Sequence, residues 1–210
     1  MQISLIGMSG TGKSHWSSQL AKLGFKRFCC DDLIAAKLNS ALIRPDGTRQ
    51  SMGEWMGFPY ESQYRACEAK YLAYEAAVLE EILSYMATPN PAEKIVIDTT
   101  GSVIYMAEPL LHRLQQHTTM VYLDTPLEVQ EKMRLAYCTN PPPVIWLDHF
   151  KPQPGETNQA ALARCYPELL ASRTSQYKLW ADVSLDYYLL RQSDFSVRDF
   201  LREINRVQVP

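Results

Sequence analysis

The sequence has no long hydrophobic run and no strong charge of either sign. No apolar stretch approaches the roughly 18 residues that a membrane-spanning helix needs. The N-terminus also lacks the basic start and apolar core that mark a signal peptide. The net charge of −2 gives no basic field for holding a nucleic acid backbone. We therefore expect a cytoplasmic protein whose main partners are neither membranes nor nucleic acids.

Cysteine and histidine are few and scattered. The five cysteines and four histidines show no paired spacing of metal ligands, so no structural zinc site is predicted. An odd number of scattered cysteines is typical of reduced thiols in the cytosol. The length of 210 residues suits one well-buried domain better than two. We expect a single domain over residues 1–210, present as a monomer or a weak homodimer.

Short apolar runs alternate with amphipathic stretches along the chain. The runs predict strands, and continuous apolar runs are typical of strands buried on both faces of a parallel sheet. Helical spacing between them predicts helices over 14–23, 64–85 and 197–204. This alternation predicts an α/β fold with three layers, α/β/α, around a parallel sheet of about five strands. The predicted strands are 3–6, 26–30, 95–97, 120–123 and 181–185.

Residues 138–154 interrupt this pattern with five prolines. Proline lacks a backbone donor and fixes φ, which argues against a regular helix or a central strand there. Long irregular segments in compact domains are often functional. We interpret residues 136–165 as a lid segment over a nucleotide, and a surface loop without a role is the alternative.

Residues 7–14 match the phosphate-loop pattern G-x-x-x-x-G-K-[ST] at every fixed position. The loop lies between an apolar strand and a helix, where glycines and the helix N-terminus can direct N–H groups at phosphate oxygens. Lys13 is expected to reach the β- and γ-phosphates, and the Ser14 hydroxyl to bind Mg²⁺. ATP and Mg²⁺ are therefore the predicted cofactors. The predicted nucleotide-binding residues are Gly7, Ser9, Gly10, Thr11, Gly12, Lys13, Ser14 and His15.

Asp98 ends the apolar run at 95–97. Ligands of open parallel sheets collect beyond the carboxyl ends of the strands, so Asp98 is a candidate to order Mg²⁺ directly or through water. The alternative is a structural residue that caps the turn at 99–101.

The order of these motifs resembles the shikimate kinase family over most of residues 1–187. After the phosphate loop, the resemblance is carried by Asp31-Asp32-Leu33-Ile34 and by Glu61-x-x-Tyr64-Arg65-x-x-Glu68. It continues with Thr99-Thr100-Gly101-Ser102, where the family has a glycine triplet, and Leu170-x-x-Arg173-x-x-x-Tyr177. The resemblance implies an ATP-dependent kinase that moves the γ-phosphoryl to a hydroxyl of a small, acidic metabolite.

The resemblance also implies roles on the acceptor side. Asp31 would hydrogen-bond the accepting hydroxyl, Arg65 and Arg173 would hold a carboxylate, and Gly101 would let the backbone approach the acceptor. Paired guanidinium donors suit a carboxylate, and a carboxylate can orient a hydroxyl and accept its proton. Each residue also has a structural alternative: a helix ion pair for Arg65, a first-turn acid for Asp31 and a solvated charge for Arg173.

Several positions depart from the family pattern. Cys29 stands where an acidic residue is usual, Thr100 and Ser102 replace two glycines, and the lid segment lacks the family's arginine. We expect Arg134 to supply the missing catalytic charge. Lys151 or Arg164 are alternatives, unless the chemistry differs.

The predicted substrate-covering region, residues 33–62, also departs from the family. Its clustered aromatic residues could line an apolar pocket or serve core packing. The rival functions are a kinase for another metabolite or a nucleoside, a nucleotide-binding regulatory protein with little turnover, and a scaffold that has lost catalysis.

Overall fold

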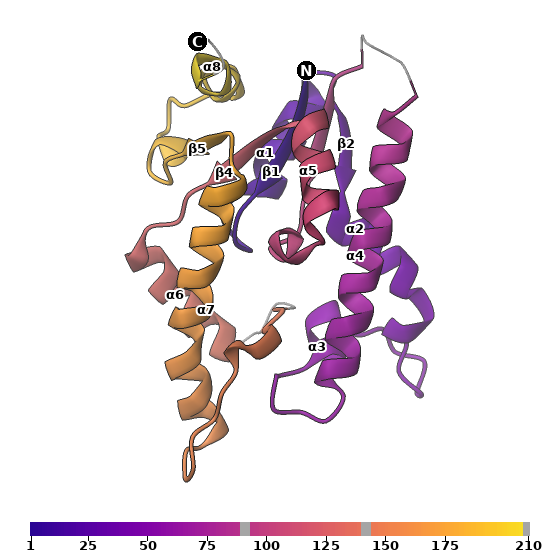
Figure 1. Ribbon diagram of the computed structural model, residues 1–210, viewed down its shortest axis with the longest axis vertical. Coiled ribbons are helices and arrows are strands. Elements are labelled where there is room, and N and C mark those ends of the chain that lie inside the picture. The colour runs from indigo at the N-terminus through magenta and orange to yellow at the C-terminus, as the bar shows by residue number, and fades with distance from the viewer. Residues whose placement is uncertain (89–92, 140–143, 208–210) are drawn as a thin grey trace.

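The sheet has five parallel strands in the order β2-β3-β1-β4-β5. A computed structural model describes residues 1–88, 93–139 and 144–207 of the chain. Its strands confirm the predicted parallel sheet, and Figure 1 shows it in the middle of the molecule. The strands are β1 (Gln2–Ile6), β2 (Lys26–Cys29), β3 (Ile95–Asp98), β4 (Thr119–Leu123) and β5 (Val183–Leu185).

Helices cover both faces of the sheet, so the predicted three layers are confirmed. Val96 and Val121 face a core shared with α1 and α8, whereas their neighbours Ile97 and Tyr122 face the larger core on the other side. This alternation is the period of two that a strand imposes. The helices are α1 (Lys13–Lys22), α2 (Cys30–Leu38), α3 (Met52–Met56), α4 (Tyr64–Met86), α5 (Glu108–His117), α6 (Leu127–Thr139), α7 (Asn158–Trp180) and α8 (Val197–Val207).

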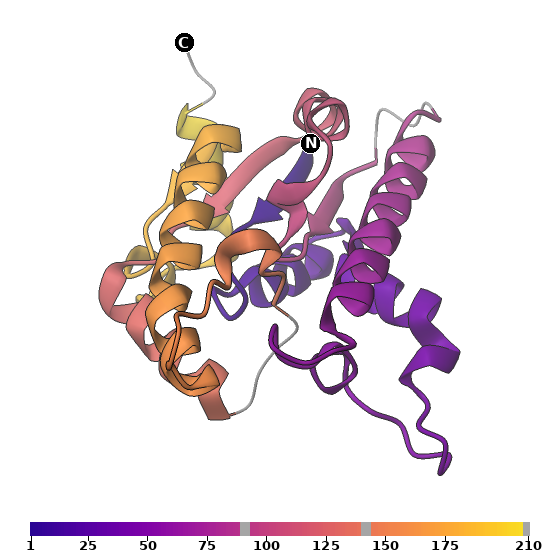
Figure 2. The same ribbon diagram turned by 60° about the horizontal axis from the view of Figure 1, so that its bottom comes forward.

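The long helices α4 and α7 extend past the sheet. In Figures 1 and 2 they run beyond its edge, and α3 and a short 3₁₀ turn at Leu147–His149 lie in the region between them. Among the residues that the structure describes, no helix combines the length and apolarity needed to cross a bilayer.

The boundaries of several predicted elements differ from those observed. The second strand ends at Cys29 because α2 begins at Cys30, and the fifth strand begins at Val183. The irregular region predicted over 138–154 was wrong at its start, since α6 continues to Thr139. Residues 140–143, which include the three consecutive prolines, lie outside the described residues. The predicted lid segment also overlaps α7, which begins at Asn158.

The packing of α1 against α8 depends on aromatic rings. Trp16 of α1 stacks on Phe200 of α8, with ring centroids 4.7 Å apart and an interplanar angle of 14°. Phe195 meets the edge of the same indole at 5.6 Å. Both Trp16 and Phe200 are buried. The stack therefore fixes the C-terminal helix against the helix that follows the phosphate loop.

Replacing Phe200 by alanine should remove this contact. We expect Phe200→Ala to lower the free energy of unfolding by about 3–5 kcal/mol, because a buried ring is lost and a cavity remains. Urea denaturation followed by circular dichroism would measure it. The exposed neighbour substitution Arg202→Ala should change the free energy of unfolding by less than about 1 kcal/mol. An equal effect of the two substitutions would contradict the role of the stack.

Candidate active site at the carboxyl edge of the sheet

The phosphate loop turns sharply between β1 and α1. Gly7, Gly10 and Gly12 have φ angles of 141°, 79° and 107°, a region that favours glycine. A Cβ on Gly7 would lie 3.1 Å from the carbonyl oxygen of Leu123 on β4. The sequence pattern therefore has a local physical reason, because this curl needs glycine and leaves the N-terminus of α1 open to an anion.

Lys13 lies in the first turn of α1 and is buried. Its ammonium Nζ donates to the carbonyl oxygens of Gly7 and Met8 at 2.7 and 2.9 Å. Burial lowers the pKa of Lys13, an effect that the nearby Asp31 carboxylate opposes. Ser14 and His15 are exposed on the same turn. The Lys13 ammonium group therefore lies over the phosphate loop, where it is predicted to bind phosphates.

A cavity of about 200 Å³ opens beside this loop. It brings together four of the predicted residues that lie far apart in the sequence: Lys13, Asp31, Gly101 and Arg173. The other lining residues come from the phosphate loop, α3, α4, the turn after β3 and the segment before α7. They are Ser9, Met52, Tyr71, Ser102 and Ile145.

Asp31 lies in the first turn of α2, directly after β2. The Tyr71 hydroxyl of α4 donates to its Oδ1 at 3.1 Å. Burial raises the pKa of Asp31, and both the Lys13 charge and the Tyr71 hydrogen bond oppose this rise. Asp31 is therefore a first-turn acid of α2 and a wall of the cavity at the same time.

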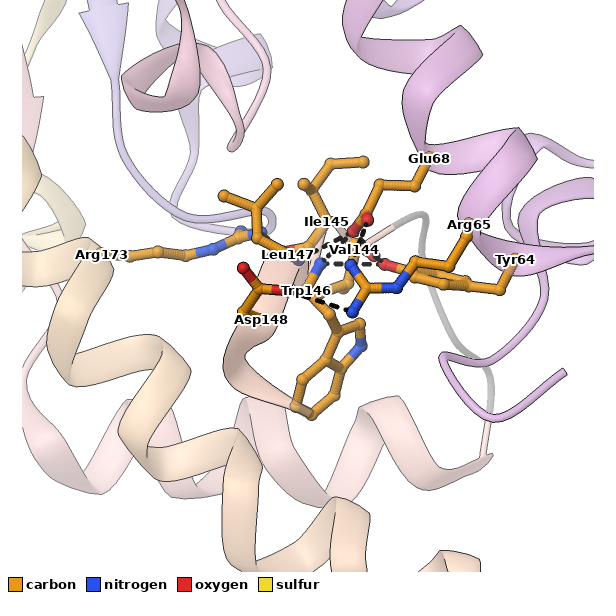
Figure 3. A network of polar contacts seen from close by, with 9 residues as sticks. All are labelled: Tyr64, Arg65, Glu68, Val144, Ile145, Trp146, Leu147, Asp148 and Arg173. Carbon is orange, nitrogen blue, oxygen red and sulfur yellow. Dashed lines mark hydrogen bonds and ion pairs between the residues drawn. The ribbon is translucent and has the colours of Figure 1, made fainter. Parts of the chain in front are cut away.

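Arg173 is buried on α7 and lines the opposite wall. Its Nη2 donates to the carbonyl oxygen of Ile145 at 2.7 Å, and its Nε donates to the Tyr105 hydroxyl at 3.2 Å. Figure 3 shows the guanidinium directed at residues 144–148. The alternative of a solvated surface charge does not fit this burial.

The turn after β3 forms the wall between the phosphate loop and Arg173. A Cβ on Gly101 would lie 3.5 Å from both the Ser9 nitrogen and Arg173 Nη1, so a side chain there would occupy the space between them. Thr100 and Ser102 direct their hydroxyls at the buried carboxylate of Glu75 on α4. Burial raises the pKa of Glu75 to about 7.

Arg65 does not belong to this cavity. Its side chain is 58% exposed and pairs with Glu68 at 3.2 Å and with Asp148 at 3.3 Å (Figure 3). The structure therefore places Arg65 in the ion pair that was its structural alternative, and its part in holding a carboxylate stays a prediction.

Residues 144–148, called here the strap, are held from both long helices. The buried Glu68 carboxylate accepts the backbone N–H groups of Trp146 and Leu147 at 2.7 and 2.8 Å. The Tyr64 hydroxyl donates to the carbonyl oxygen of Val144 at 2.8 Å. Ile145 of the strap lines the cavity, and Figure 3 shows the strap between α4 and Arg173 of α7.

Arg134, predicted to supply the missing catalytic charge, lies on α6 and pairs with Glu131. Arg164 pairs with Glu156 at 2.7 Å and donates to the carbonyl oxygen of Lys151. The described residues that line the cavity include none of these three basic side chains. Among the lining residues, Lys13 and Arg173 carry the positive charges, and the catalytic role of Arg134 stays a prediction.

Asp98 ends β3 beneath α1. Its Oδ2 accepts from Ser17 Oγ at 2.9 Å and pairs with Arg27 Nη2 at 2.7 Å. Ser17 is one helical turn beyond Ser14. The carboxylate therefore serves an ion pair, and its part in ordering Mg²⁺ stays a prediction.

A second cavity of about 210 Å³ lies on the other side of the phosphate loop. Its base includes the predicted residues Thr11, Gly12 and His15. Arg191, in the turn Leu189–Arg191 after β5, donates from Nη2 to the Thr11 carbonyl oxygen at 3.1 Å, and its guanidinium lies 3.4 Å from the Tyr187 ring centroid. Arg191 was not predicted, although it follows a strand whose carboxyl end lies at the ligand edge of the sheet.

Sequence reasoning also assigned no site role to the acidic residues and Tyr71 of α4. Glu68, Tyr71 and Glu75 are spaced three and four residues apart on the buried stripe of this helix. Acidic residues on an apolar stripe are a usable signal, because buried carboxylates need partners. In this chain their partners are the strap and the turn after β3.

Comparison with known proteins identifies the fold. No family model and no curated protein matches the sequence. Among solved structures, shikimate kinase from Acinetobacter baumannii in complex with shikimate has a TM-score of 0.62 and 21% identity, covering 99% of this chain and 92% of that one. Shikimate kinase from Aquifex aeolicus has a TM-score of 0.61 and 17% identity, covering 100% of this chain and 99% of that one. Shikimate kinase from Bacteroides thetaiotaomicron has a TM-score of 0.59 and 16% identity, covering 99% of this chain and 96% of that one.

The phosphate loop and the three layers define a P-loop kinase fold. The comparisons narrow this class, since the chain has the fold of the shikimate kinases with a divergent sequence. This confirms the fold that the order of the motifs implied.

The raised pKa of Glu75 predicts a pH-dependent stability. Its folded pKa is about 7 against an ordinary value of 4.5, so the folded state keeps a proton that the unfolded state releases. Relative to Glu75→Gln, the wild type should lose about 2–3 kcal/mol of unfolding free energy as the pH rises from 5 to 8. Urea denaturation at each pH measures the difference. Glu81→Gln, at an exposed position of the same helix, is the control variant. A flat difference for Glu75→Gln would contradict the assignment.

Proposed function

We propose that this protein transfers the γ-phosphoryl of ATP to a hydroxyl of a small, acidic molecule. The observation that carries the proposal is the meeting of Lys13, Asp31 and Arg173 around one cavity beside the phosphate loop. These three groups supply what the reaction needs: a cation at the phosphates, a carboxylate at the accepting hydroxyl and a guanidinium for the acceptor's charge.

The donor set fits a nucleotide's phosphates. Successive glycines and the N-terminus of α1 present backbone N–H groups, and Lys13 lies over the same loop. The nucleoside part would lie in the second cavity of about 210 Å³, whose lining includes Trp16 and Arg191. For Mg²⁺, the exposed Ser14 hydroxyl is the candidate ligand, with Asp98 acting through water. When bound, the ion would neutralise charge on the phosphates.

The acceptor would bind in the cavity of about 200 Å³. Arg173 would hold its anionic group, and Asp31 would orient its hydroxyl. In the transfer, the bond between the γ-phosphorus and the β–γ bridging oxygen breaks while a bond to the acceptor oxygen forms. The hydroxyl proton passes to Asp31, and Lys13 stabilises charge on the phosphates.

Shikimate is the nearest candidate for the acceptor, because the Acinetobacter baumannii protein of the same fold was solved with it. Two features argue for an acceptor that differs from it. Arg65 pairs with Glu68 and Asp148 outside the cavity, and Thr100 and Ser102 add side chains at the wall. The proposal is therefore a kinase for a small hydroxy acid, with shikimate as the first compound to test.

A nucleotide-binding regulatory protein with little turnover is the second candidate. It is favoured by the contact between Arg173 and the carbonyl oxygen of Ile145, which occupies part of the guanidinium, and by the absence of arginine from the strap. It differs in its outcome: ATP would bind, but no hydroxy acid would stimulate ADP release.

Lys13→Ala should weaken ATP binding at least tenfold, because a buried ammonium at the phosphate loop is lost. Isothermal titration with ATP and Mg²⁺ measures the affinity. Lys22→Ala, at the other end of α1, is the matched control and should leave it unchanged. Equal affinity of wild type and Lys13→Ala would remove the phosphate loop from nucleotide binding.

Asp31→Asn should lower kcat at least a hundredfold and leave the KM for ATP within about twofold, since it acts on the acceptor side. In the wild type, kcat should rise with pH as Asp31 ionises, with a midpoint above the ordinary 3.8 because burial raises its pKa. The same assay on Asp32→Asn, the adjacent acid, controls for local charge. Wild-type turnover by Asp31→Asn would exclude it as the base.

A further inference from the structure

Glu75 is a buried acid that the proposed phosphoryl transfer does not use. It lies on α4 and is 1% exposed. Its Oε1 accepts the hydroxyl of Thr100, and its Oε2 accepts the hydroxyl of Ser102 at 2.5 Å. A buried carboxylate is costly unless it is hydrogen-bonded, and here each oxygen has a hydroxyl donor from the turn that walls the cavity.

Ser102 has both of its donors engaged inside this wall. Its backbone N–H donates to Thr100 Oγ1 at 3.1 Å, and its hydroxyl proton is directed at Glu75. Ser102 nevertheless lines the cavity. The Ser102 oxygen also lies 3.0 Å from Thr100 Oγ1, where either hydroxyl could donate. Because a hydroxyl carries one proton and two lone pairs, and the proton is directed at Glu75, the further hydrogen bond open to Ser102 is one in which its oxygen accepts.

The same turn is fixed from α7. The Tyr177 hydroxyl donates to the carbonyl oxygen of Gly101 at 2.5 Å. Tyr177 lies four residues after Arg173, so both side chains emerge from one face of the helix. The turn that carries Ser102 is therefore hydrogen-bonded to the helix that carries Arg173, and both residues line the same cavity, so the two groups can contact one small ligand together.

We propose that Glu75 is a positioning residue of the site that binds the phosphoryl acceptor. By accepting a hydrogen bond from the Ser102 hydroxyl, Glu75 leaves the Ser102 oxygen to accept a hydrogen bond from the ligand. The ligand then carries a hydrogen-bond donor beside the anionic group bound by Arg173. The inference rests on the proposed kinase function and deepens it. The acceptor is a hydroxy acid with a second donor, such as a further hydroxyl, in addition to the hydroxyl that receives the phosphoryl group.

The protonation of Glu75, which lies among several titratable and charged groups, makes this selection depend on pH. Asp31, Cys30 and Tyr71 approach it from α2 and α4, Arg173 and Tyr177 from α7, and Lys13 from the phosphate loop. Burial raises the pKa of Glu75 to about 7. Below this pH the carboxyl group carries a proton of its own and can donate to one hydroxyl, which frees that hydroxyl's proton. The preference for a ligand with a hydrogen-bond donor at this position should therefore be stronger at pH 8 than at pH 6.

The test compares kcat/KM for an acceptor and its monodeoxy analogues. The probes are shikimate, quinate and glycerate, each assayed by ADP release beside analogues that lack one hydroxyl. The variants are Ser102→Ala, which removes the accepting oxygen, and Glu75→Gln, which keeps the size but not the charge. The exposed Glu81→Gln on the same helix is the matched control.

At pH 8, the wild type should have a kcat/KM for the parent acid about two- to tenfold higher than for one of its monodeoxy analogues, which is the range of a single hydrogen bond. Ser102→Ala should abolish this preference, and Glu75→Gln should weaken it and remove its pH dependence. Neither variant should change the KM for ATP by more than about twofold. If Glu75 had a purely structural role, its replacement would instead lower kcat/KM for ATP and for the phosphoryl acceptor together.

The outcomes separate the two proposals. An active wild type whose discrimination survives in Ser102→Ala and Glu75→Gln would overturn the role of Glu75 and leave the kinase proposal standing. An equal loss of kcat/KM for ATP and for the phosphoryl acceptor in these variants would also overturn the role of Glu75. If the wild type binds ATP but transfers phosphate to none of the acids, both proposals are overturned.

Discussion

The parallel pairing of β1 with its two neighbours is the constraint on which the site depends. Parallel strands end at the same edge, and the register places Leu5 of β1 beside Asp98 of β3. The phosphate loop leaves β1 at this edge, α2 starts there after β2, and the Gly101 turn follows β3. Lys13, Asp31 and Gly101 are therefore neighbours because of topology, before any side-chain contact is considered.

The second constraint is the polar stripe of α4. Glu68 and Glu75 lie seven residues apart, two turns along one face of the helix, and both are buried. Glu68 holds the strap through backbone N–H groups, and Glu75 holds the cavity wall through hydroxyls. Arg173 reaches across from α7 to the strap. Two carboxylates and one guanidinium thus fix the cavity's lining, since leaving any of them unpaired would be costly.

This arrangement explains where prediction from sequence succeeded. The strands follow from continuous apolar runs such as 95–97, and the phosphate loop from glycines whose positive φ angles no other residue adopts easily. The order of the motifs implied roles for Asp31, Gly101 and Arg173 on the acceptor side; the three residues line one cavity, and their roles stay predictions. Features set by local backbone chemistry and strand order were accessible from the chain alone.

Features set by contacts across long sequence separations were not. Arg65 fits a motif, but its partner Asp148 lies 83 residues away in a segment whose path the sequence does not define. The strap's attachment to Glu68 spans 78 residues and uses main-chain groups, which leave no sequence signature. Arg134 is a separate case that does not involve a distant contact: it was chosen for its charge and its neighbourhood in the chain, whereas its side chain pairs with Glu131 one helical turn away. The acids on the apolar stripe of α4 were a visible signal, but their partners were not.

The central claim is that one cavity places a nucleotide's terminal phosphate and an acidic acceptor between Lys13, Asp31 and Arg173. A crystal structure with ADP, Mg²⁺ and a hydroxy acid tests it most directly. The account predicts that Lys13 Nζ exchanges the Gly7 and Met8 carbonyl oxygens for phosphate oxygens. It also predicts that the acid lies with its carboxylate on Arg173 and a hydroxyl at Asp31. A bound nucleotide with Lys13 still on those carbonyl oxygens, or an acid bound outside this cavity, would contradict it.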